Sequence, residues 1–303
     1  MDEEAIRKYR DAGRALRAAL RKAVDSVHPG MKVLELCELV EGVVREYGAE
    51  PAFPTNVGIN DVAAHYTAVI GDGLTIPSNS VVKIDAGAHI DGYITDAAVT
   101  VYFNDAFSLL AKAARNALVN AIDNFKPGTS MGRIGAVVEK TVRSYGYKPI
   151  ENLTGHLIRR YELHAGVSVP NVEVDGGEKV MEGETYAIEP FTTNGRGHVV
   201  EGRAVTIYRV ERLTAKKLDK ELAKALDAIY SRFNSLPFTP RWLVKDLGQG
   251  AASIVEQLTR RGALYGYATL VEAGKGFVAQ FEDTVLVTSD GAQPLVGTAE
   301  LAQ

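Results

Sequence analysis

An internal repeat constrains the fold of this chain more than any other feature of its sequence. When the sequence is shifted by 98 residues, residues 15–51 align with residues 113–149 without a gap, and 15 of the 37 positions are identical. Each copy has a Pro-Gly pair between two runs of apolar residues at helical spacing, and each ends near a Tyr-Gly pair that matches a glycine helix end. Each copy therefore predicts two amphipathic helices. Together they predict a pseudo-symmetric fold with duplicated halves rather than a longer repeat array.

Segments of strand character follow both pairs of predicted helices. They cover residues 53–67, 81–101, 152–169, 184–192 and 276–288. In the second of these segments, the central Asp91-Gly92 pair favours a tight two-residue hairpin turn. With that turn, Gly87 pairs with Asp96, and Asp85 lies diagonally from Asp96 on the same face, roughly 7–8 Å away.

Four of the acids in these segments follow runs of apolar strand residues, where an isolated charged carboxylate is costly. They are Asp85, Asp96, Glu189 and Glu282. We expect strands of both halves to form one central sheet in which the acids converge, and two divalent cations would cancel their negative charges. Three histidines beside glycine or alanine complete a candidate site, because imidazole suits first-row transition metals. They are His65, His156 and His164.

Residues 210–270 differ in character from the rest of the chain. Leu222, Leu226 and Ile229 fall at helical spacing, and Thr239-Pro240 matches the start of a short helix. This pattern predicts a helical insertion. Basic residues near its start are interrupted by acids, which favours a solvated helix face over a nucleic-acid surface.

Charge and composition exclude several classes of protein. The net charge of the 303 residues is -4, which gives no basic field for nucleic acid or an anionic membrane. No run reaches the ~18 apolar residues of a spanning helix, and the acidic start is unlike a secretory signal. Cys37, the only cysteine, lies in an apolar helical run and is expected in the core, without a disulfide. We therefore expect a cytoplasmic protein.

Eight different short motifs occur along nearly the whole chain in a specific order and spacing. They cover residues 53–56, 63–67, 83–85, 95–96, 155–156, 164–166, 188–191 and 280–282. Together they resemble those of the type II methionine aminopeptidases. The resemblance implies an α+β pita-bread (creatinase/aminopeptidase) fold whose catalytic domain is 1–209 plus 271–303, with 210–270 as the helical insertion subdomain of type II enzymes. The chain lacks a long charged extension before the repeat and is similar to the compact archaeal form.

The resemblance also implies two divalent metal ions per chain, with cobalt, manganese, iron and zinc as candidates. It assigns Asp85 to one ion, His156 and Glu189 to the other, and Asp96 and Glu282 to both. Glu189 is also expected to shuttle a proton. His65 and His164 are expected to contact the substrate amide and stabilise the tetrahedral intermediate. The slot for the methionine side chain is assigned to Phe53, Leu163 and Tyr267.

Two positions depart from the family pattern. Asp283 follows Glu282 where the family usually has histidine, and Gly58 stands where serine is common. Neither is a ligand, and the alternation of side chains along a strand predicts that Asp283 points away from the metals.

The implied activity is hydrolytic removal of the initiator methionine from nascent proteins and peptides with a small second residue, by a water that the two metals activate. The implied partners are peptides with methionine first, and the ribosome is a further candidate. We expect a monomer without a direct role at nucleic acid or membranes. One alternative is a proline-directed peptidase, although such enzymes usually carry an N-terminal domain and this repeat begins near Ala15. Another is a non-catalytic interaction protein of the same fold, although such relatives have lost ligands that this chain retains.

Overall fold

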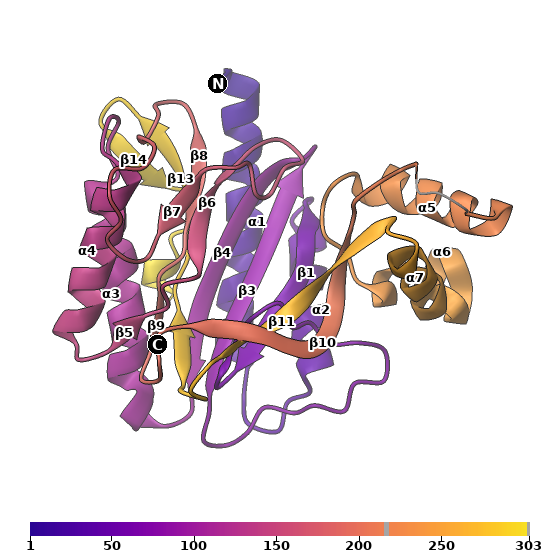
Figure 1. Ribbon diagram of the computed structural model, residues 1–303, viewed down its shortest axis with the longest axis horizontal. Helices are drawn as coiled ribbons and strands as arrows, with labels where there is room; N and C mark the ends of the chain where they lie inside the picture. Colours follow the sequence, from indigo (N-terminus) through magenta and orange to yellow (C-terminus); the bar gives the residue numbers. More distant parts are fainter. Residues whose placement is uncertain (215–217, 302–303) are drawn as a thin grey trace.

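Two similar helical pairs pack against the sheets of the molecule (Figure 1). The computed structural model describes residues 1–214 and 218–301. The pairs are α1 (Glu3–Ser26) with α2 (Val33–Glu46), and α3 (Ser108–Asn124) with α4 (Met131–Ser144). Gly48 and Gly146, which follow α2 and α4, have φ angles of 77° and 81° and so end both helices in the left-handed region. The helical pairs predicted from the repeat are therefore confirmed.

The first half contributes a three-stranded antiparallel sheet on which α1 packs. Its strands, in spatial order, are β1 (Glu50–Ile59), β3 (Val81–Ile90) and β4 (Tyr93–Tyr102). Gly87 pairs with Asp96 and Ile90 pairs with Tyr93, as the hairpin prediction required. The turn residues Asp91 and Gly92 have φ angles of 50° and 82°, which an Asp-Gly pair tolerates. Asp85 and Asp96 are thus diagonal neighbours on one face.

The strands of the second half lie in three further sheets within the described residues. The largest runs β14 (Gly291–Pro294), β13 (Asp283–Thr288), β8 (Thr185–Ile188), β6 (Thr154–Ile158) and β7 (Ser168–Pro170). A smaller sheet runs β12 (Val278–Gln280), β9 (Phe191–Thr193) and β5 (Lys148–Pro149). The last runs β10 (Val199–Val210), β11 (Leu264–Glu272) and β2 (Val62–Ala64), so β2 joins the two halves.

The expectation of one central sheet with unbroken strands at 184–192 and 276–288 is wrong. The first segment breaks at Glu189 and Pro190, because proline has no N–H to offer a strand ladder. The second breaks at Phe281 and Glu282, where Glu282 leaves the ladder of its own half and exchanges backbone hydrogen bonds with Ala98 of β4. Each broken segment therefore serves two sheets, and each break carries one of the predicted acids.

The helices of residues 210–270 extend from the ends of β10 and β11, at the edge opposite α3 and α4 (Figure 1). They are α5 (Lys220–Phe233), α6 (Val244–Leu247) and α7 (Ala251–Arg260), with the 3-10 helices η2 (Pro240–Leu243) and η3 (Gly248–Gly250). They enclose a separate apolar cluster that includes Leu226, Phe238 and Val255. The predicted helical character is confirmed for the described residues, and residues 215–217 lie outside them. The bounds of the insertion as a subdomain stay a prediction.

A buried ion pair connects these helices to the first half. The Glu41 carboxylate on α2 accepts hydrogen bonds from the Thr55 N–H (3.1 Å), from Trp242 Nε1 (2.7 Å) and from Arg241 Nη1 (2.6 Å). Arg241 also donates through Nε to the Ala68 carbonyl (3.0 Å). Arg241 and Trp242 therefore hold η2 against α2 and the segment around Ala68.

The main core lies between the helices and the sheets, and it contains Cys37, as the sequence predicted. Two short 3-10 helices, η1 (Asp105–Phe107) and η4 (Thr298–Glu300), complete the described elements. None of the helices in the described part of the chain has the length and apolar character that crossing a membrane requires.

Candidate metal centre and its cavity

A cavity of about 230 Å³ lies where strands of the two halves meet. All ten residues predicted for the site are on its wall. They are Phe53, His65, Asp85, Asp96, His156, Leu163, His164, Glu189, Tyr267 and Glu282. The structure therefore brings together residues that lie up to 229 positions apart, since Phe53 and Glu282 face the same cavity.

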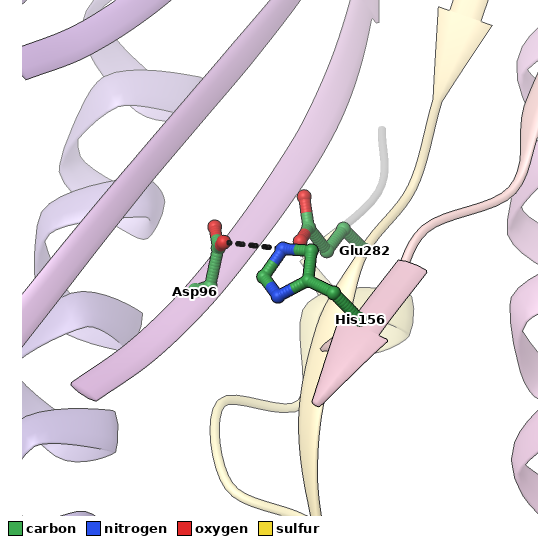
Figure 2. A group of neighbouring side chains, drawn as sticks. All are labelled: Asp96, His156 and Glu282. Atoms are coloured by element: carbon green, nitrogen blue, oxygen red, sulfur yellow. Dashed lines mark ion pairs between the residues drawn. The ribbon is translucent and has the colours of Figure 1, made fainter. Parts of the chain in front are cut away.

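Three buried side chains form a compact group at the seam between the halves. Asp96 comes from β4, His156 from β6 and Glu282 from the break between β12 and β13, and Figure 2 shows the three side chains close together. One ligand atom from each lies within 4.8 Å of the others. His156 Nε2 is 3.5 Å from Asp96 Oδ2 and 3.8 Å from Glu189 Oε1. A single cation could therefore contact groups from both halves.

Threonine hydroxyls hold the two halves together on either side of the Ala98–Glu282 bridge. The Thr284 hydroxyl accepts from the Asp96 N–H and donates to the Asp96 carbonyl, both at 2.7 Å. The Thr100 hydroxyl accepts from the Gln280 N–H (2.9 Å) and donates to the Gln280 carbonyl (2.6 Å). We call this arrangement the threonine seam. It fixes the backbone of Asp96 relative to the strand break that carries Glu282.

Gln280 also contributes its side chain. Its Nε2 donates to Glu282 Oε2 at 3.0 Å, which orients that carboxylate. The sequence motif 280–282 contained this glutamine, but sequence reasoning gave it no role. Residues two positions apart in an extended segment lie on the same face, which lets the Gln280 side chain reach the Glu282 carboxylate.

The acids of the cavity disfavour one another's charged forms. Burial, reinforced by neighbouring carboxylates, raises the pKa of Asp85, Glu189 and Glu282 well above their ordinary values. Burial raises the pKa of Asp96 to about 7. Burial also lowers the pKa of His156 to about 4, so its ring is neutral at pH 7 and can offer a lone pair. Among the described residues, no lysine or arginine lines this cavity to balance these carboxylates.

The donor set fits divalent metal ions. The Oδ1 atoms of Asp85 and Asp96 are buried without a hydrogen-bond partner among the described residues, although such atoms are usually paired in proteins. Carboxylate oxygens with a neutral imidazole nitrogen suit first-row transition metals. A bound metal ion could provide a partner for both carboxylates.

His65 and His164 stand beside this acidic group. His65 has a φ of 66°, which is uncommon outside glycine, and its ring packs edge-on against Tyr267 at 5.3 Å between centroids. His65 Nδ1 lies 3.2 Å from the Ala268 carbonyl, which can only accept, so Nδ1 carries the proton. Since Nδ1 holds the proton, the Nε2 atom of His65 is available as a hydrogen-bond acceptor. The His164 ring lies 4.3 Å from the His156 ring.

An apolar wall completes the cavity. Phe53 and Leu163 pack in one cluster, and a Cβ added at Gly87 would lie only 2.4 Å from the Phe53 ring, so Gly87 leaves the space that this ring fills. Sequence reasoning gave no role to eight other wall residues, of which Asn56, Ala64 and Phe191 stood inside site motifs. They are Asn56, Ala64, Asn152, Leu153, Thr154, Phe191, Ile207 and Pro237. Ile207 and Pro237 gave no signal, because apolar residues in strands and loops are ordinary.

The two departures from the family pattern lie off the wall of the cavity. Asp283 points away from it, as strand alternation predicted, and accepts backbone N–H groups of Val296, Gly297 and Thr298 at 2.7–3.0 Å. A Cβ at Gly58 would lie 2.5 Å from the Val62 carbonyl oxygen, so this backbone leaves no room for serine.

Comparison with protein families matches residues 7–289 to Metallopeptidase family M24. The chain belongs to this family. The M24 metallopeptidase is 46% identical over 293 residues to the methionine aminopeptidase of Saccharolobus solfataricus, covering 96% of this chain and 97% of that protein. The resemblance read from the motifs is therefore confirmed, together with its likeness to archaeal relatives.

Solved structures show the same fold. A thermophilic Arx1 superposes on this M24 metallopeptidase with a TM-score of 0.85 at 20% identity, covering 100% of this chain and 94% of that one. The methionine aminopeptidase of Thermotoga maritima gives a TM-score of 0.71 at 23% identity, covering 98% of both chains. At these identities the likeness concerns the fold alone, and it confirms the expected pita-bread architecture.

Proposed function

We propose that this metallopeptidase removes an N-terminal methionine from peptides whose second residue is small, with two divalent metal ions. The observation that carries the proposal is the cavity, which combines four acids and three histidines with an apolar wall. The relative at 46% identity, which is named a methionine aminopeptidase, supports the same activity. Cobalt, manganese, iron and zinc are the candidate ions, because this ligand set accepts several of them.

We propose that Asp85 holds one ion, that His156 and Glu189 hold the other, and that Asp96 and Glu282 contact both. When bound, such ions lower the pKa of a water they share, so that hydroxide is available near neutral pH. The side chains of the chain then have to bind the peptide and move protons.

Glu189 suits the role of proton carrier in this scheme. Burial and the neighbouring Asp96 and Asp85 raise its pKa, which favours its taking up a proton. Neutral His65 can accept a substrate N–H through Nε2, since Nδ1 is committed to Ala268. His164, whose pKa falls to about 3 through burial and neighbouring His156, His65 and Arg209, is also neutral and can face the substrate amide.

The apolar wall suits an unbranched side chain. Phe53, Leu163 and Tyr267, with Ile207 among the residues beside them, are the proposed contacts of the methionine side chain. We also propose the cytoplasm as the location, which the single buried cysteine supports. We propose that the protein is a monomer. The ribosome is a candidate partner, because initiator methionine is removed from nascent chains.

The test compares metal-free protein with protein reloaded with cobalt, manganese or iron(II), using the peptides Met-Ala-Ser and Met-Leu-Ser. We expect methionine release from Met-Ala-Ser only, and only after reloading. Equal release from both peptides would contradict the specificity, and cleavage confined to Xaa-Pro peptides would favour a proline-directed peptidase. Elemental mass spectrometry of natively purified protein would identify the ion and its number per chain.

A further inference from the structure

A second cavity, about 480 Å³ in volume, opens beside the first. The two share the wall residues Leu163, His164, Pro237 and Tyr267, so they adjoin each other, and we call them the inner and the outer compartment. The inner compartment, at about 230 Å³, is smaller than the ~300–1,000 Å³ of sites for drug-sized ligands. It has room for little beyond the first residue of a peptide. The outer compartment is the adjoining space that could receive the rest of a substrate.

Arg209 of β10 is the cation on the wall of the outer compartment. Its Nη2 pairs with Glu211 at 2.7 Å, and its guanidinium lies 5.2 Å from the centre of the Tyr265 ring. Tyr267, which lines both compartments, is near enough for the charge of Arg209 to act on its hydroxyl group. Glu211 and the Tyr265 ring thus hold the guanidinium while its side chain remains 37% exposed.

The fixed guanidinium has donors left for a ligand. Arginine carries five N–H donors, and its partners here use only part of them. Glu211 pairs with Arg209, and Glu162 lies on the same wall, so both offset its positive charge. A neutral acceptor therefore suits Arg209 better than an acidic side chain would. The backbone carbonyls of an extended peptide are such acceptors, and they are present whatever the sequence of the substrate.

We propose that the outer compartment binds the peptide backbone beyond the second residue, and that Arg209 donates hydrogen bonds to a carbonyl there. This inference rests on the proposed function and extends it, because it makes chain length a determinant of turnover. Hydrogen bonds from a charged donor are stronger than neutral ones, and a preorganised donor loses little freedom on binding.

The test uses the metal-loaded full chain and three amidated peptides, which lack a free carboxylate that could attract arginine. They are Met-Ala-NH2, Met-Ala-Ser-NH2 and Met-Ala-Ser-Ser-NH2. For the wild type we expect kcat/KM to rise by about tenfold or more from the shortest to the longest peptide, mainly through KM. Arg209→Met should lose this gain with length, so that its kcat/KM falls most for the longest peptide and least for the shortest.

Arg212→Met is the matched control, because Arg212 is exposed and lies on neither compartment's wall. It should keep the full gain with length. The proposal is overturned if the wild type shows no gain, or if Arg209→Met slows all three peptides by the same factor, which would mean that Arg209 acts on the reacting centre. If no peptide releases methionine, the proposed function fails and the inference fails with it.

Discussion

At the scale of single residues, the acids of the hairpin are not equivalent. Asp96 is buried, belongs to the group with His156 and Glu282, and has its backbone fixed by Thr284. Asp85 lies on the same face but outside that group, and it is only partly buried. If Asp96 contacts both proposed ions and Asp85 only one, the two residues should differ in their response to mutation.

We expect Asp96→Asn to lower kcat/KM by more than about 100-fold, because losing a residue that merely supports a metal ligand already costs about 10–100-fold. Asp85→Asn should retain one bound ion and measurable activity. Steady-state kinetics and metal content per chain, with circular dichroism as the folding control, check this. Equal metal loss in both variants would contradict the assignment of Asp96 as the bridging ligand.

The residues of the centre were predictable from the sequence because each carries a signal of its own. An acid such as Glu189 inside an apolar strand, or a histidine such as His156 beside glycine, is unusual without a partner. Arg209 and Ile207 could not be found in this way. A charged or apolar residue on a strand is ordinary, and only the cavities show which of them face a substrate.

At the scale of elements, local patterns predicted the helices and the hairpin, but they failed where long-range contacts decide. The pairing of Gly87 with Asp96 follows from the Asp91-Gly92 turn alone. Residues 276–288 were expected to be one strand, and the break at Glu282 depends on Ala98, which lies 184 positions earlier. No local pattern encodes that partner.

The threonine seam gives a prediction for β13. Thr284→Val keeps the shape of the side chain but leaves the Asp96 N–H and carbonyl without their hydroxyl partner, at roughly 1–3 kcal/mol for each buried group. We expect a lower free energy of unfolding and weaker metal binding, measured by denaturant titration and calorimetry. Thr284→Ser should restore both. Metal affinity unchanged in Thr284→Val would show that the seam does not position the ligand.

The ion pair between Arg241 of the helical insertion and Glu41 of α2 gives a second prediction at this scale. Arg241→Met removes one partner of a buried ion pair, which typically costs about 3–5 kcal/mol. The double variant Glu41→Leu/Arg241→Met should lose less stability than the two single changes add up to, because no unpaired charge remains. Urea unfolding of the four proteins measures the coupling. Additive losses would mean that the two side chains act independently.

At the scale of the whole molecule, the candidate centre lies between the duplicated halves and draws ligands from both. Asp85 and Asp96 come from the first-half sheet, whereas His156, Glu189 and Glu282 come from the second half. Bound cations would therefore connect the halves as well as serve catalysis. The repeat in the sequence predicted the halves, but only the structure shows that the described strands divide into four sheets.

Metal removal should therefore lower the thermal transition, by roughly 5–10 °C when the metal is about 100-fold above its Kd. Burial raises the pKa of Asp96 to about 7 in metal-free protein, above its value in the unfolded chain. As the pH falls through 7, the folded protein therefore takes up a proton at Asp96, which stabilises it relative to the unfolded chain. This proton partly replaces the charge of the cations. Metal removal should thus lower the temperature of the thermal transition more at pH 8 than at pH 6.5. Differential scanning calorimetry with and without chelator measures both values. An equal loss at both pH values would contradict the electrostatic explanation.

The hydroxyl groups of Thr100 and Thr284 also bear on how such a centre can evolve. A continuous backbone ladder holds neighbouring strands about 4.7–4.9 Å apart through main-chain hydrogen bonds. Here threonine side chains flank the Ala98–Glu282 backbone bridge, so we expect a substitution of either threonine to alter the spacing between Asp96 and Glu282. Selection could in this way tune the centre to ions of different radius while the duplicated architecture stays intact.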